Sequence, residues 1–173
     1  MDAWDLLRDG FERVHELMGA VLGGNPDLDR APDGGNTPAW ILWHLVRVQD
    51  DHVADAFELE QVWYTGWADR FALPFPARET GYGMSAEEVA KVHVTPELLQ
   101  GYHEDVHAQT LKALAGKPDL DRVVDERWDP PVTLGVRLLS VLADELQHLG
   151  QAAYVLGLPE DYAGSGRVAR SIQ

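Results

Sequence analysis

The stretch from Ala3 to Leu22 reads AWDLLRDGFERVHELMGAVL, and its apolar residues recur at steps of three and four: Leu6, Leu7, Phe11, Val14, Leu17, Met18, Val21 and Leu22. This spacing is typical of an amphipathic helix that lays one apolar stripe on a core. The segment Gly23-Gly24-Asn25-Pro26 should end it, because glycine adopts the left-handed C-cap and proline cannot extend a helix.

Further along the chain, start and stop signals predict three more long helices. Thr37-Pro38 and Thr95-Pro96 each place a capping oxygen before a proline that suits the first helical turn, and Thr133 offers a third cap. We therefore expect helices over residues 38–62, 96–116 and 134–156, the last stopped by Gly157 and Pro159. A capping box at 85–88 predicts a short helix over residues 85–93.

No window shows a long alternation of apolar and polar residues, so the fold class predicted is all-α. The simplest way to bury four amphipathic stripes is a four-helix bundle. Residues 63–84 form a long, irregular and aromatic-rich excursion between the second and third long helices, and a connection of that length is often functional. We expect one domain over residues 1–162 and a loose C-terminal tail over residues 163–173.

Composition excludes several classes of function. The 173 residues are 45% hydrophobic and carry a formal net charge of −15, which argues against binding the phosphate backbone of nucleic acid. The absence of cysteine excludes disulfides, thiolate zinc sites and a cysteine nucleophile. Because the chain has no apolar run long enough to span a bilayer and no export signal at its start, we expect a cytoplasmic protein without a membrane partner.

The last predicted helix holds Asp144 and His148, which lie four residues apart and so project from neighbouring points on one face. A carboxylate and an imidazole one turn apart can bind the same divalent cation. The alternative is a surface ion pair worth a few tenths of a kcal/mol. The apolar neighbours Val141, Leu142 and Leu149 favour partial burial, where a carboxylate is costly unless it is paired or bound to metal.

A third ligand could come from the second helix, where His44 and His52 are candidates. They lie about 12 Å apart along the axis, so they cannot both bind one ion. The periodicity slightly favours His52 as the inward residue. A rival chelate is His103 with His107 on the third long helix, although the apolar stripe there predicts that both turn at least partly to solvent.

The run from Asn36 to Leu45 (NTPAWILWHL) and the run from Asp144 to Gln151 (DELQHLGQ) resemble the DinB-like superfamily. That superfamily includes the metal-binding domain of mycothiol-dependent maleylpyruvate isomerase and the bacillithiol transferases. The resemblance implies an up-down-down-up bundle, often a homodimer, that holds one divalent metal ion such as zinc or nickel. It also implies that His44, Asp144 and His148 are the ligands, and so selects His44 over His52.

Two imidazoles and one carboxylate leave coordination positions open, as in catalytic rather than structural sites. The resemblance implies that the metal activates the thiol of a cosubstrate, mycothiol or bacillithiol, which then attacks a small-molecule electrophile in a transferase or isomerase reaction. The aromatic excursion would help to wall the substrate pocket. The alternative is a stress-response bundle that binds a metal or small ligand without catalysis.

Overall fold

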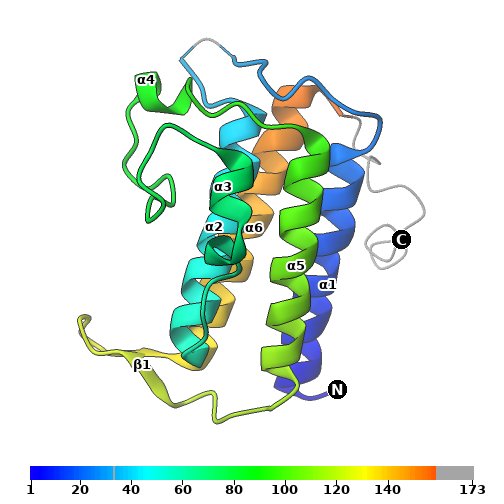
Figure 1. Cartoon of the computed structure of the whole chain (residues 1–173). Helices are drawn as coiled ribbons and strands as arrows, with labels where there is room; N and C mark the ends of the chain where they lie inside the picture. The colour runs from blue at the N-terminus through cyan, green and yellow to red at the C-terminus, as the bar shows by residue number, and fades with distance from the viewer. Residues whose placement is uncertain (33, 159–173) are drawn as a thin grey trace.

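The computed structural model describes residues 1–32 and 34–158, and four long helices dominate it (Figure 1). They are α1 (Ala3–Leu22), α2 (Pro38–Phe57), α5 (Pro96–Leu114) and α6 (Leu134–Leu156). Helices α1 and α6 run in one direction and α2 and α5 in the other, and each packs against two neighbours around a shared core. The predicted all-α, up-down-down-up bundle is therefore confirmed.

The predicted helix boundaries follow from capping. The hydroxyls of Thr37, Thr95 and Thr133 each accept a hydrogen bond from the backbone N–H three residues later. At the far end of α6, Gly157 takes a left-handed conformation with φ of 69° and donates to the last carbonyls. These caps satisfy backbone groups that the helix itself leaves unpaired.

Helix α2 is buried on nearly every side, because α5, α6 and the excursion after it all cover it. Its buried residues include His44, Arg47, Gln49 and Asp50 besides the apolar ones. Hydrophobic periodicity has little directional meaning on such a helix. This explains why the slight preference for His52 as the inward histidine is wrong: His44 is 7% exposed, whereas His52 is only half-buried.

Helix α2 also ends earlier than predicted, at Phe57 rather than near residue 62, with Glu58 in a left-handed conformation. The buried carboxylate of Asp50 accepts hydrogen bonds from the backbone N–H groups of Val62 (2.9 Å) and Trp63 (2.8 Å). It thereby holds the returning chain against the side of α2 and starts the 3₁₀ helix η1 (Val62–Thr65).

The excursion is more ordered than an irregular loop. After η1 it forms α3 (Trp67–Phe71), which packs on α5, and later α4 (Ala86–Val89), which the predicted capping box starts but which is shorter than expected. The rings of Trp63, Trp67 and Phe71 gather around Tyr102, with centroids 5.2–5.6 Å from that ring. These aromatic residues therefore build core between the excursion and α5.

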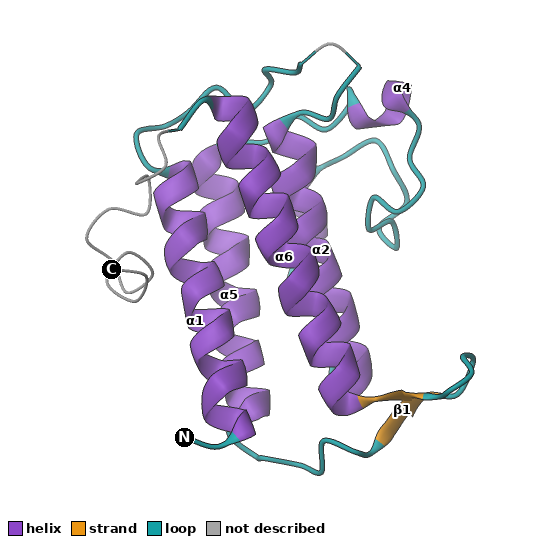
Figure 2. Cartoon of the chain, turned by 180° about the vertical axis from the view of Figure 1, so that it is seen from behind, coloured by secondary structure: helices purple, strands orange, loops and turns teal. Residues whose placement is uncertain are grey.

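Two short antiparallel strands precede α6: β1 (Val123–Asp125) and β2 (Val132–Thr133) (Figure 2). They were not predicted, because two or three residues are too few to display a period of two. The predicted tail and the domain end at residue 162 lie outside the described residues. Among the helices that the structure describes, none has both the length and the apolar character needed to cross a membrane.

Candidate metal centre

Helices α2 and α6 lie side by side and antiparallel, and they bring three of the predicted residues together. One possible ligand atom from each of His44, Asp144 and His148 lies within 4.8 Å of the other two. His44 is buried, and the other two side chains are half-buried at the edge of the bundle. The structure therefore places at one point the three ligands that the family resemblance implied.

The orientation of His44 is fixed by the excursion. Its Nδ1 donates to the backbone carbonyl of Thr80 at 2.5 Å, and Trp40 stacks on the ring with centroids 4.8 Å apart. Because this hydrogen bond assigns the proton to Nδ1, the lone pair is left on Nε2. Metal-binding histidines in general are held by such a hydrogen bond from the ring nitrogen that does not bind the metal.

Gly81 makes this approach possible. Its φ is +97°, and a Cβ atom built on it would lie 2.8 Å from His44 Nδ1 and 3.1 Å from the ring of Trp43. A side chain there would be strained and would collide with the histidine. Thr80 and Gly81 were not predicted as part of the site, since Gly81-Tyr82-Gly83 reads from sequence as an ordinary turn.

The second histidine is held within its own helix. His148 Nδ1 donates to the backbone carbonyl of Asp144 at 2.8 Å and lies 3.3 Å from Asp144 Oδ2. Its ring meets that of His44 edge-on, with centroids 5.0 Å apart. In the neutral ring, Nε2 of His148 is therefore the nitrogen that carries the lone pair.

The electrostatics of the three groups are coupled. Burial is the main cause that lowers the pKa of His44, so this ring is neutral and ready to act as a ligand at neutral pH. Burial also disfavours charge on His148 and Asp144, but their mutual interactions outweigh it. The pKa of His148 is therefore raised and that of Asp144 lowered.

These residues fit a divalent cation. Asp144 Oδ2 is buried, and in the described part of the chain it faces His148 Nδ1 at 3.3 Å without a well-formed hydrogen bond, so a bound cation would compensate its burial more fully. Two imidazole nitrogens and a carboxylate oxygen suit zinc and similar metals, with ligand distances of about 2.0–2.2 Å. Pairs of ligands then lie at most about 4.4 Å apart, so small side-chain movements would close the site around one ion.

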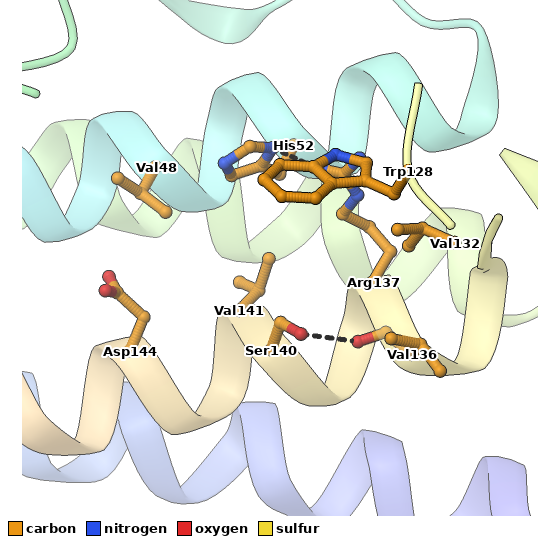
Figure 3. Close-up of a pocket in the computed structure, with 9 residues that line it drawn as sticks. All are labelled: Val48, His52, Trp128, Val132, Val136, Arg137, Ser140, Val141 and Asp144. Atoms are coloured by element: carbon orange, nitrogen blue, oxygen red, sulfur yellow. Dashed lines mark hydrogen bonds between the residues drawn. The ribbon is translucent and has the colours of Figure 1, made fainter. Parts of the chain in front are cut away.

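The alternative ligand His52 lies two turns along α2 and does not join this group. Its Nδ1 accepts a hydrogen bond from Arg137 Nη1 at 2.6 Å, and it lines a pocket beside the candidate centre. This pocket, of about 290 Å³, lies between α2 and α6 next to Asp144 (Figure 3). Trp128, from the connection between the two strands, forms its outer wall.

None of the residues that line this pocket comes from the aromatic excursion, so the predicted part of the excursion in a substrate pocket stays a prediction. A separate cavity of about 310 Å³ lies under the excursion and includes Trp63 and Phe75. The excursion instead reaches the candidate centre through the backbone of Thr80 and Gly81.

The rival pair on α5 is placed differently from the prediction. His103 is fully buried rather than turned to solvent, and His107 is half-buried. Helix α1 covers this face of α5, and its His15 stacks on His107 and His103 with centroids 4.3 Å and 5.3 Å apart. In the described residues, the possible ligand atoms of this cluster do not come as close together as those of His44, Asp144 and His148.

Comparison with known proteins agrees with the resemblance to the DinB-like superfamily. The sequence pattern of the DinB superfamily matches residues 6–152. Among solved structures, a conserved protein of Enterococcus faecalis is 30% identical in sequence and superposes with a TM-score of 0.80, over 90% of this chain and 95% of that one. No curated protein sequence matches the chain.

Proposed function

Because the chain belongs to the DinB superfamily, we propose that it is a divalent-metal-dependent enzyme, a transferase or isomerase that uses a low-molecular-weight thiol as cosubstrate. The observation that carries this proposal is the convergence of His44, Asp144 and His148. Zinc or nickel is the proposed metal, and mycothiol or bacillithiol the proposed thiol. A homodimer is proposed on the family resemblance alone.

The bound cation would lower the pKa of a thiol beside it and so favour the thiolate, the nucleophilic form. The chain's own residues position and enclose the reactants. Thr80 holds His44 in one tautomer, and the backbone carbonyl of Asp144 holds His148. The valines and Trp128 of the adjacent pocket offer an apolar surface beside the candidate centre. Since the chain has no cysteine, the attacking sulfur must come from the cosubstrate.

The first test is the metal content of protein purified without a polyhistidine tag. We expect about one equivalent of divalent metal per chain, lost in His148→Ala while the helical circular dichroism is retained. His107→Ala is the matched control, because it removes an imidazole outside the proposed centre. Equal metal content in His148→Ala and the parent would contradict the proposal. Loss of metal in His103→Ala alone would contradict it as well.

The second test separates an enzyme from a binding protein. Metal-loaded protein is incubated with mycothiol or bacillithiol and a panel of small electrophiles, and thioether formation or isomerisation is followed by mass spectrometry and NMR. We expect turnover that stops on chelation and in His148→Ala. Stoichiometric metal without turnover of any thiol and electrophile would favour the non-catalytic bundle instead.

A further inference from the structure

The pocket beside Asp144 has an apolar body. Its walls are the side chains of Val48, Val132, Val136, Val141 and Trp128 (Figure 3). Its volume of about 290 Å³ lies just below the usual range for small-molecule sites, which is about 300–1,000 Å³. Trp128 is 65% exposed, so its indole closes the pocket from outside rather than belonging to the core.

One end of this pocket offers hydrogen-bond donors. Arg137 Nη1 donates to His52 Nδ1 at 2.6 Å, and Arg137 Nη2 donates to Asp125 Oδ2 at 3.0 Å. Because His52 Nδ1 is an acceptor, the proton of this neutral ring lies on Nε2, which has no hydrogen-bond partner in the described residues. His52 and the remaining guanidinium hydrogens of Arg137 therefore present N–H groups and no acceptor.

Two arginines and three aspartates surround this end of the pocket. Asp125 is shared between Arg127 and Arg137, so two guanidinium groups face one carboxylate. The carboxylates of Asp51 and Asp55 line a different, polar cavity on the other side of His52 and Arg137. Among the residues that line the apolar pocket, the charged ones are Arg137 and, at the opposite end, Asp144.

The two ends are a fixed distance apart. Arg137 and Asp144 lie seven residues apart on α6, which corresponds to about 10 Å along the helix axis. A small molecule that spans the pocket would therefore reach the candidate metal centre with one end and the donors with the other.

We propose that this pocket binds the electrophilic substrate and selects a small apolar molecule that carries a carboxylate, bound by Arg137 and His52 with its body against Trp128. The identification of this molecule as the substrate rests on the proposed function. Its binding in the pocket does not depend on that function. A guanidinium group binds a carboxylate through charge-assisted hydrogen bonds, so a neutral amide of the same shape should bind less well. The reacting carbon would then lie toward Asp144.

The test compares phenylacetate with phenylacetamide, titrated into the zinc-loaded full chain and again after chelation, with NMR chemical shifts as readout. We expect the carboxylate to bind about tenfold more tightly or better in both states. Arg137→Gln should remove this preference, whereas Arg8→Gln, which removes an exposed guanidinium elsewhere, should keep it. Trp128→Ala should weaken both probes.

Ser140→Asp provides a second variant that leaves Arg137 in place, because Ser140 is exposed on α6 and lines the pocket. The added carboxylate should repel phenylacetate and leave phenylacetamide unchanged, and Ser140→Asn should affect neither. Equal affinity for the two probes would overturn the inference. So would a preference that vanishes on chelation and persists in Arg137→Gln, since phenylacetate would then be binding zinc directly.

These outcomes are separable from those for the metal centre. One equivalent of metal with no carboxylate preference overturns the pocket inference and leaves the proposed function standing. A carboxylate preference that depends on Arg137, in a chain that binds no metal, supports the pocket and refutes the proposed function.

Discussion

The backbone carbonyl of Thr80 accepts a hydrogen bond from His44 Nδ1 across 36 residues of chain. This contact makes the excursion part of the candidate metal centre, because it fixes which nitrogen of His44 is free to bind a cation. The conformation of the excursion therefore affects the orientation of His44 in the candidate metal centre.

Gly81→Ala should therefore weaken metal binding without unfolding the bundle. The new methyl group would displace the His44 ring, and loss of such supporting contacts commonly reduces metal affinity by about 10- to 100-fold. Competition with a fluorescent zinc chelator measures the effect. The matched control is Gly83→Ala, since Gly83 also has a positive φ but open space around it. Equal affinities of the two variants would contradict this role for Gly81.

Asp50 should matter for stability and, through the excursion, for the site. Its buried carboxylate accepts hydrogen bonds from Val62, Trp63 and the Tyr102 hydroxyl, and it faces the buried guanidinium of Arg47 at 3.6 Å. Asp50→Ala would leave Arg47 without its carboxylate, and we expect a loss of about 3 kcal/mol or more in the free energy of unfolding. Urea denaturation at pH 7.5 measures it.

Asp51→Ala is the control for that experiment, because Asp51 is only half-buried and bonds to the side chain of Gln61. It should cost about 1 kcal/mol or less. A similar small loss in Asp50→Ala would mean that the carboxylate does not anchor the excursion.

The histidine cluster between α1 and α5 should make stability sensitive to acid. The pKa of His103 is lowered to about 3 and that of His107 to about 4, mainly because both rings are buried. The neighbouring His15 lowers both pKa values further, whereas Glu12 raises that of His107. Both rings are therefore neutral in the folded protein. The unfolded chain takes up protons near pH 6.5, so stability is full above that pH and falls as the pH drops toward 4.

The expected slope is at most about 1.4 kcal/mol per pH unit for each of these histidines. Urea denaturation at pH 7.5, 6.0 and 5.0 measures it. His103→Leu should flatten the dependence, while His93→Leu, a change at an exposed histidine, should not. An unchanged slope in His103→Leu would show that other groups cause the acid sensitivity.

The helix bundle could be predicted from the sequence because most of its helix ends depend on local signals. The threonine caps and Gly157 act locally, so their effect is visible in a few consecutive residues. The end of α2 is set by Asp50, which binds Val62 and Trp63 from a distance, and no local signal records that. For the same reason the site residues Asp144 and His148, which are four apart, could be proposed from spacing, whereas Thr80 and Arg137 could not.

The choice between His44 and His52 illustrates the same limit. Because α2 is covered on almost all sides, periodicity favoured the wrong histidine, and only the family resemblance pointed to His44. The burial of His103 was missed in a related way, since its partner His15 lies on another helix.

The most direct test of the account is anomalous diffraction at the zinc edge from crystals of untagged protein grown with zinc. We predict one strong peak per chain, bonded to Nε2 of His44, a carboxylate oxygen of Asp144 and Nε2 of His148. A peak among His15, His103 and His107 instead, or no peak between α2 and α6, would contradict the central claim that these three side chains form a metal centre.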